Sequence, residues 1–260
     1  MNNYFFNYGI LFFISFNLLS EDIGQPGELF PVKVNFDEFN KSSGLVKINN
    51  DYYKLIPLSY SKQDEYIEFN KSKIFIQKKD FGESRITITN NKLVNLSDED
   101  RERTIRESAI IKKALQSYSK DITPKFNFMR PVEGIISSRY GKKRFINDSL
   151  RSPHLALDIA APEGTAIFAP DNGRIILIGN FFYSGNFVLI DHGYGLVSSY
   201  SHLSSVSVSK GDILDKGQKI GEVGSTGRVT GPHLHWAVYY EEVRINPESL
   251  LRDNYLKTLL

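Results

Sequence analysis

Hydrophobic and polar residues alternate in short runs over the first third of the chain. Between residues 28 and 96, apolar side chains recur at about every second position in segments such as "ELFPVKVNF", "SKIFIQ" and "SRITITNNKLVNL". A period of two predicts strands, and the pairs Asn49-Asn50 and Asn90-Asn91 fall between such segments as turn residues that tolerate positive φ. The pattern predicts a small β-rich domain over residues 21–96.

The period changes after Asn95. Ser97 and Asp100 resemble a capping box, and Ile111, Leu115 and Tyr118 follow at i, i+4 and i+7. This spacing predicts a helix that begins at Ser97 and ends before Pro124. Residues 97–130 are therefore expected to be a helix and linker between two domains.

From Gly134 onward the pattern is almost wholly that of strands. Short apolar runs, such as "GRIILIG" and "LVSSYSHL", are punctuated by Gly, Pro, Asn or Asp, and no long amphipathic helix interrupts them. Such spacing predicts a curled antiparallel sheet or a barrel-like sandwich. The whole chain is thus expected to be mostly β, with a second domain over residues 131–250 and a C-terminal tail over 251–260.

The N-terminus carries an apolar stretch from Tyr4 to Ser20, and Glu21 is the first charged residue after it. The stretch is shorter than the roughly 20 apolar residues of a spanning helix and is typical of a signal-peptide core, with cleavage after Ser20. The alternatives are an uncleaved membrane tether through residues 4–19 or a buried strand. The prediction is an exported protein of the periplasm or cell envelope.

The composition excludes several kinds of binding site and catalytic group. The net charge is +2, from 32 basic and 30 acidic residues, so bulk electrostatics argue against nucleic-acid binding. The chain contains no cysteine, which excludes disulfides, thiol nucleophiles and cysteine-ligated zinc. A metal would have to be held by His, Asp or Glu. All five histidines lie in the second predicted domain: His154, His192, His202, His233 and His235.

The spacing of the histidines indicates a metal site. His233 and His235 are two residues apart, so on a strand both imidazoles share a face while Leu234 and Trp236 occupy the other. His154 and Asp158 are four apart and share a face of an extended segment. Two imidazoles and one carboxylate form a catalytic zinc set with a position open for water. Spacing alone leaves open which other histidine completes the set.

Three motifs in order, "HLALD", "YSHLS" and "TGPHLHW", resemble the signature of the lysostaphin-type (LytM-type) zinc endopeptidases. These enzymes cut peptide bonds in bacterial peptidoglycan, and the resemblance covers about residues 131–250. Transferred position by position, it implies that His154, Asp158 and His235 bind zinc. It also implies that His202 and His233 are catalytic histidines without a metal bond, while His192, in a Gly-flanked turn, is expected to be structural.

The resemblance implies a zinc-dependent endopeptidase that hydrolyses cross-links of peptidoglycan, with D-alanyl–diaminopimelate bonds as targets by analogy to envelope members of the family. One alternative is a non-catalytic scaffold of the same fold that binds the wall or activates a cell-wall amidase. Such relatives typically lack some of the ligands that are present here. A second alternative, a biotin- or lipoyl-carrier hairpin at "GDILDKGQKIGEVGSTG", has no place for the histidines.

A hydrolase of the cell wall is dangerous to the cell that makes it. We therefore predict that the N-terminal domain or the segment "KKRFINDSLRSP" partly covers the groove, with Asn147 as an additional metal contact.

Overall fold

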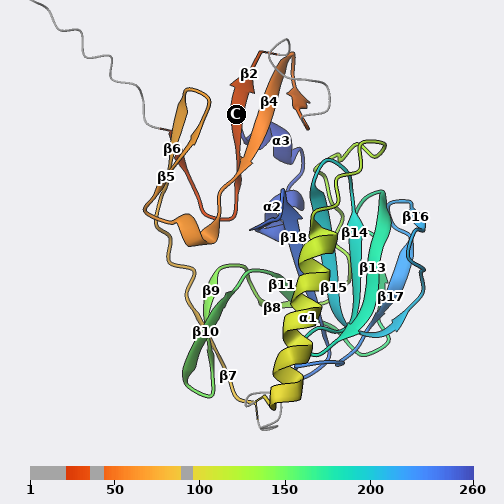
Figure 1. Cartoon of the computed structure of the whole chain (residues 1–260). Coiled ribbons are helices and arrows are strands. Elements are labelled where there is room, and N and C mark those ends of the chain that lie inside the picture. Colours follow the sequence, from red (N-terminus) through yellow and green to blue (C-terminus); the bar gives the residue numbers. More distant parts are fainter. Residues whose placement is uncertain (1–21, 36–43, 89–95) are drawn as a thin grey trace, which may run out of the picture.

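A computed structural model describes residues 22–35, 44–88 and 96–260 (Figure 1). The expected signal peptide or tether and the Asn90-Asn91 turn lie outside the described residues. Within the described ranges, no helix is both long and apolar enough to cross a membrane.

The second half of the chain forms one large, mainly antiparallel sheet, as the periodicity predicts (Figure 1). Its main path runs β16-β13-β14-β15-β18-β11-β8, while β12 pairs with β17, which also pairs with β15, and β19 pairs with β18. The bounds are β8 Ile135–Ser138, β11 Leu157–Ala160, β12 Ala166–Phe168, β13 Gly173–Phe181, β14 Gly185–Asp191, β15 Leu196–Val206, β16 Ile213–Leu214, β17 Lys219–Val223, β18 His233–Tyr240 and β19 Val243–Ile245.

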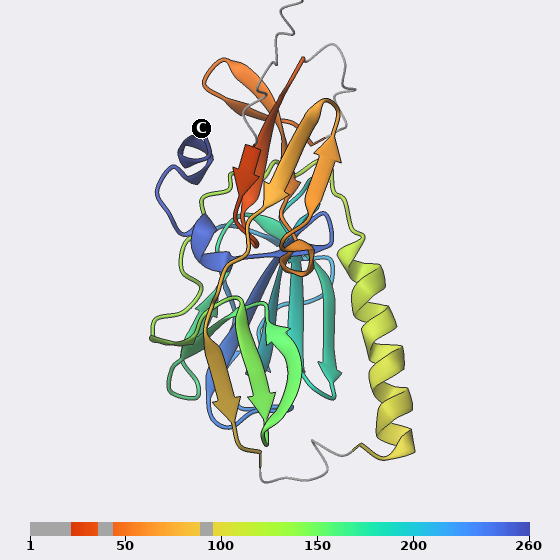
Figure 2. The ribbon, with the colours of Figure 1, turned by 90° about the vertical axis from the view of Figure 1, so that its left-hand side faces the viewer.

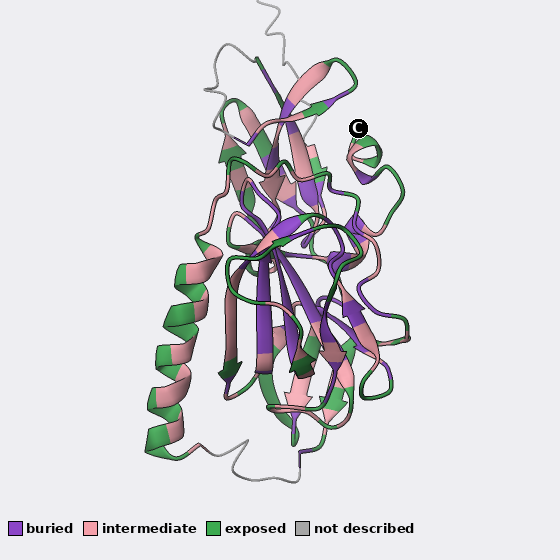
Figure 3. Ribbon diagram, turned by 90° about the vertical axis from the view of Figure 1, so that its right-hand side faces the viewer, coloured by how far each residue is buried: buried purple, intermediate pink, exposed green. Residues whose placement is uncertain are grey.

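The two faces of β18 have different surroundings. Leu234, Trp236 and Val238 are fully buried in the main core, together with Leu157 and Ile159 of β11. Figure 3 shows this buried interior running through the sheet. The opposite face carries the two histidines at the start of the strand and then two buried residues, Ala237 and Tyr239, that belong to a second apolar cluster. This face is therefore covered at one end and open at the other.

Helix α1, Asp98–Leu115, supplies that cover (Figures 1 and 3). The Ser97 hydroxyl accepts a hydrogen bond from the backbone N–H of Asp100 at 3.1 Å, as the capping box predicts. Ile111 and Leu115 pack against the second apolar cluster. The helix ends at Leu115, earlier than the pattern indicates, and Tyr118 lies beyond it with its ring against that of Tyr194.

The N-terminal part contains two small sheets above the large one (Figure 2). Leu29 and Leu55 are buried in the main core, so these sheets are anchored to the second half. The tail also packs here, because the Tyr255 side chain is buried and its hydroxyl accepts a hydrogen bond from the Leu29 N–H at 3.3 Å. The strands are β1 Asp22–Gly24, β5 Tyr66–Phe69 and β6 Ser72–Ile76 in one sheet and β2 Leu29–Val34, β3 Val46–Ile48 and β4 Asp51–Pro57 in the other; a 3₁₀ turn spans Tyr60–Lys62, and short helices α2 and α3 span Pro247–Leu250 and Tyr255–Thr258.

A further three-stranded sheet joins the two halves. Strand β7, Glu83–Ile86, pairs in parallel with β9, Lys142–Ile146, and β9 forms a hairpin with β10, Ser149–His154. The hairpin turn is Asn147-Asp148, with φ of 47° and 59°, as a two-residue type I′ turn requires. The segment "KKRFINDSLRSP" is thus a β-hairpin, and β7, expected in the N-terminal domain, is hydrogen-bonded to it.

Candidate metal centre and cleft

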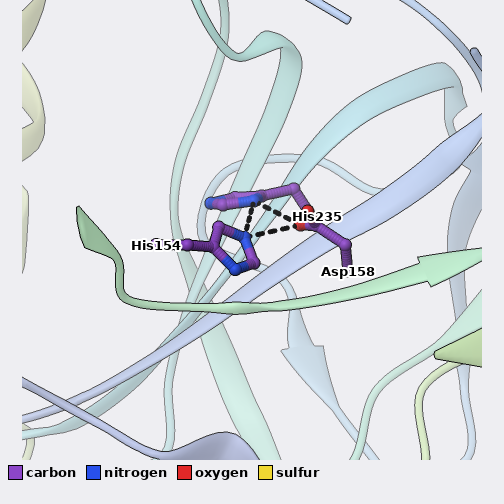
Figure 4. Close-up of side chains that lie close together, drawn as sticks. All are labelled: His154, Asp158 and His235. Carbon is purple, nitrogen blue, oxygen red and sulfur yellow. Dashed lines mark hydrogen bonds and ion pairs between the residues drawn. The ribbon is translucent and has the colours of Figure 1, made fainter. Parts of the chain in front are cut away.

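Two of the expected metal ligands are brought together by strand register. Strands β11 and β18 are antiparallel neighbours in which Asp158 lies directly opposite His235. Side chains directly opposite each other share a face, and the His235 Nδ1 lies 2.7 Å from the Asp158 Oδ1 (Figure 4). The alternation expected for the His-x-His pair is therefore what places an imidazole on this carboxylate.

His154 also lies beside the Asp158 carboxylate, but it is not on the same strand as Asp158. Strand β10 ends at His154 and β11 begins at Leu157, so a break separates the residues that were expected on one extended segment. The His154 Nε2 nevertheless lies 2.9 Å from the Asp158 Oδ1 and 3.3 Å from the His235 Nδ1 (Figure 4). The ligand atoms of the three residues all lie within 4.8 Å of one another.

This donor set fits zinc. Two imidazole nitrogens and one carboxylate oxygen are ligands that Zn²⁺ accepts in three-residue sites, and no cysteine or further acidic residue is needed. The His154 Nδ1 lies 3.1 Å from the Arg139 carbonyl oxygen. An Nδ1–H donated to this carbonyl leaves the Nε2 lone pair directed at the centre, which is the usual support for a ligating histidine.

Burial of His235 and the histidine contacts of Asp158 keep these two ligands in the protonation states that a metal requires. Burial lowers the pKa of His235 to about 4, so its ring is neutral at neutral pH. Burial by itself raises the pKa of Asp158, but the charge and hydrogen bond of His235 and the hydrogen bond of His154 hold this pKa well below the usual range. A neutral imidazole beside an ionised carboxylate is the metal-binding form of the site.

His202 lies beside this centre because β15 is irregular. Ser201 is opposite His235, so regular alternation would send the next side chain away from the cleft. His202 instead adopts a left-handed φ of 70°, and the register against β14 shifts here. Both Ser201 and His202 then line the cleft. A bulge in β15 therefore turns the His202 side chain into the cleft.

His202 and His233 form a second pair of imidazoles. Their ring centroids are 4.9 Å apart, and the His202 ring is 5.8 Å from that of His235. The Nδ1 of His202 is 2.9 Å from the Thr226 carbonyl oxygen, and the Nδ1 of His233 is 2.9 Å from that of Gly231. Each Nδ1–H is thereby held by the backbone, and each Nε2 remains to exchange a proton. Burial, helped by the charges of His235 and His233, lowers the pKa of His202 to about 3, so this ring is neutral.

His192 is placed apart from these four histidines. It is fully buried, with Nδ1 2.7 Å from the Asn172 carbonyl oxygen and Nε2 2.7 Å from the Ser198 hydroxyl. Its ring packs against that of Phe128, with the two ring centroids 4.7 Å apart. These contacts fit the structural role expected of it.

The centre lies at the floor of a cleft of about 470 Å³. One wall comes from β7, the residues that directly follow it, and β9; it is lined by Ser84, Ile86, Ile88, Arg144 and Ile146. The other side comes from Tyr183 and the loop of residues 228–232. Sequence reasoning missed Arg144 and Arg228, although both lie close to the motifs, in "GKKR" and "STGRVTG".

Asn147 does not have the role expected of it. Its side-chain oxygen accepts a hydrogen bond from the Ile88 N–H at 2.9 Å, and its amide donates to the Ile88 carbonyl at 3.0 Å. Both amide atoms are thus used to hold Ile88 against the hairpin, and the expected extra metal contact is not supported. Asn147 fastens the wall of the cleft.

A mostly antiparallel β-fold, a His/Asp/His centre and two further imidazoles at one cleft define a metallopeptidase-like site. The sequence profile of Peptidase family M23 matches residues 152–247. The chain therefore carries a peptidase family M23 domain, and the resemblance to the LytM and lysostaphin family is confirmed. The matched segment includes all five residues expected to act at the site.

One solved structure resembles most of the chain, and two curated proteins resemble about half of it. A crystal structure of a candidate M23 peptidase from Pseudomonas aeruginosa is 28% identical, covers 87% of this chain and 94% of its own, and has a TM-score of 0.65. Peptidoglycan DD-endopeptidase ShyA of Vibrio cholerae is 39% identical over 120 residues, or 46% of this chain and 27% of ShyA. DD-carboxypeptidase/endopeptidase Mpg of Neisseria meningitidis is 42% identical over 125 residues, which are 48% of this chain and 29% of Mpg. The chain thus matches less than a third of the length of either curated relative.

Proposed function

We propose that this protein is a zinc-dependent endopeptidase that hydrolyses peptide cross-links of bacterial peptidoglycan. The observation that carries the proposal is the convergence of the His154, Asp158 and His235 ligand atoms within 4.8 Å at the floor of an open cleft. The names of ShyA and Mpg support peptidoglycan as the substrate.

The residues divide the work between metal binding and proton transfer. His154, Asp158 and His235 would hold zinc, which when bound polarises a carbonyl and makes water a better nucleophile. His202 and His233 lie next to this trio, each with its Nδ1 held by a backbone carbonyl. Their Nε2 atoms are free of that constraint, so one can accept a proton from the attacking water and the other can donate one to the leaving amine.

The substrate also indicates where the protein acts. Peptidoglycan lies in the cell envelope, so we infer that the protein works there, in the periplasm of a bacterium with an outer membrane. Export through residues 1–20 remains a prediction. D-alanyl–diaminopimelate cross-links are the target that we propose.

The non-catalytic alternative has no observation in its favour. A scaffold of the same fold needs neither the three ligands nor two further imidazoles beside them, and this chain contains all five. A zinc assay joined to a digestion assay separates the two functions.

The test uses the full chain and two variants. We expect about one zinc per chain and release of cross-linked peptides from purified peptidoglycan by the unmodified protein. His235→Ala should lose zinc and activity, because it removes a ligand. His233→Ala should keep zinc and lose activity. Stoichiometric zinc with no bond cleaved in any preparation would instead assign the protein to the scaffold class.

A further inference from the structure

Two arginine side chains line the cleft beside the candidate metal centre. Arg144 comes from β9 in one wall, and Arg228 from the loop that precedes β18. Among the described residues that line the cleft, Asp158 is the only acidic one, and its carboxylate is hydrogen-bonded to His154 and His235. The cleft thus carries two guanidinium groups and no uncommitted carboxylate.

Arg144 has no acceptor within the described part of the chain. It makes no ion pair or side-chain hydrogen bond there, and its Nε is buried without a partner. A buried donor without an acceptor is costly, so such groups usually serve a ligand or a water. The negative charge of Asp158 acts on Arg144, although no hydrogen bond joins the two. The guanidinium therefore lies close to the metal ligands and is not used by them.

The surroundings of Arg144 add positive charge instead of removing it. Arg151 of β10 lies directly opposite Arg144 in the hairpin, so the two side chains share a face. Like charges directly opposite each other destabilise a strand pair. Burial lowers the pKa of Arg228, and the charges of Arg144 and Arg151 lower it further. An anion bound in the cleft would relieve this repulsion.

Arg228 is held in a fixed position. Its backbone N–H donates to the Tyr183 carbonyl at 3.0 Å, and its guanidinium lies 4.0 Å from the centre of the Tyr183 ring. The preceding Gly227 has a φ of 79°, and a Cβ there would come within 2.4 Å of the Gly185 nitrogen. The loop is therefore pressed backbone to backbone against residues 183–185. Arg228 thus belongs to well-supported backbone, as a recognition site requires.

We propose that Arg144 and Arg228 bind a free carboxylate on the residue that supplies the nitrogen of the cleaved bond. This inference rests on the proposed function. In a bond from D-alanine to the D-centre of diaminopimelate, and in a terminal D-alanyl-D-alanine, the carbon attached to the amide nitrogen carries such a carboxylate. A planar guanidinium matches a carboxylate with two parallel hydrogen bonds. The arginines would therefore select these bonds and reject bonds inside a glycine bridge, which lack the carboxylate.

The test compares two substrates that differ only at this group. The first is a diacetyl-L-lysyl-D-alanyl-D-alanine peptide with a free C-terminal carboxylate, and the second is its C-terminal amide. The full-length zinc protein should cleave the acid about 10- to 100-fold more efficiently in kcat/KM, the range expected for a hydrogen bond to a charged group. Arg144→Gln should abolish this preference, mainly by raising KM for the acid, because the carboxylate is bound equally before and during reaction.

Two variants make the test specific. Arg144→Lys keeps the charge but loses the paired hydrogen bonds, so it should retain only part of the preference. Arg151→Gln is the matched control, because it removes an arginine opposite Arg144 that is exposed and does not line the cleft. It should keep most of the preference for the acid, because it removes a nearby charge but no hydrogen-bond donor of the cleft. Circular dichroism and zinc content check that each variant is folded and loaded.

The outcomes separate this inference from the proposed function. Equal cleavage of acid and amide by the unmodified protein, or an equal loss of kcat on both in Arg144→Gln, would refute the carboxylate site and leave the peptidase standing. Calorimetry with the His233→Ala protein measures binding of both peptides without turnover. If neither peptide is cleaved but the acid binds more tightly in an Arg144-dependent way, the carboxylate site stands, and digestion of purified peptidoglycan decides the peptidase. Equal binding of acid and amide together with no cleavage of purified peptidoglycan would refute both.

Discussion

The floor and the wall of the cleft are built in different ways. The floor comes from neighbouring strands of one sheet, where register alone places Asp158 opposite His235 and the backs of both strands are fully buried. The wall comes from β7 and β9, two short strands from distant parts of the sequence, fastened by the Asn147 amide. The floor is thus backed by the buried core, whereas the wall is held by the pairing of short strands and by the Asn147 hydrogen bonds. Changes to the floor should affect chemistry, and changes to the wall should affect access.

The largest expected effect is at the floor. His202→Ala should lower kcat by about 10²- to 10⁴-fold, because it removes a positioned proton-transfer group. Zinc content should not change, because the three ligand atoms belong to other residues. Zinc analysis beside single-turnover kinetics checks both parts. Loss of zinc from this variant would show that His202 is a metal ligand, and would contradict its assignment to proton transfer.

A smaller effect is expected at the wall. Asn147→Gly keeps the positive φ of the hairpin turn but removes both hydrogen bonds to Ile88. Each such bond contributes about 1 kcal/mol, so the wall should open more often and cleavage of intact peptidoglycan should rise several-fold. A short soluble peptide without a free carboxylate, which does not use Arg144 of this wall, should be cleaved at an unchanged rate.

Asp148→Gly is the control for the wall. It changes the other residue of the same turn and leaves the Ile88 contacts in place; the ion pair to Arg85 that it removes is exposed at both ends and therefore weak. Its activity on both substrates should match that of the unmodified protein. If Asn147→Gly also shows no gain on intact peptidoglycan, the wall does not restrict access.

The smallest effect concerns the framework behind the floor. Burial lowers the pKa of His192 from its ordinary value of 6.5, against the opposing hydrogen bond to Asn172 and the charges of Asp171 and Asp191. The unfolded chain therefore takes up this proton at higher pH than the folded one. The free energy of unfolding should fall as pH drops below about 6.5, by roughly 1 kcal/mol for each unit by which the two pKa values differ.

His192→Gln isolates this contribution. Glutamine does not titrate, so the thermal unfolding temperature of the variant should change less between pH 7 and pH 5 than that of the unmodified protein. Differential scanning calorimetry at several pH values measures both. Parallel curves for the two proteins would show that His192 does not contribute to the pH dependence.

The sequence predicts the floor much better than the wall, for physical reasons. A period of two determines which side chains share a face, so the alternation of His233 and His235 with Leu234 and Trp236 is legible, as is the mainly antiparallel fold. His154 and Asp158 meet as expected, but across a break between strands. The position of His202 depends on a bulge, which periodicity does not encode.

The wall depends on pairing between distant segments. Ser84 of β7 is aligned with Arg144 of β9, and both strands are short and lack a distinctive pattern. Local spacing therefore cannot show that the two segments meet. The roles of Arg144 and Asn147 follow from that pairing. The sequence therefore suggested this segment as a cover but not its hairpin, and it assigned Asn147 a metal contact that the hydrogen bonds to Ile88 do not support.

The contact between Tyr255 and Leu29 affects the order in which the protein can be completed. These residues are 226 positions apart, and the Tyr255 ring is buried against the N-terminal strands. Contacts of such separation form late, because a long loop must close first. During synthesis this contact can therefore form only after residue 255 has been made, although Leu29 and Leu55 can already pack into the main core. A chain truncated before residue 255 would lack this last contact with the N-terminal strands, and that region should be cleaved more readily by proteases.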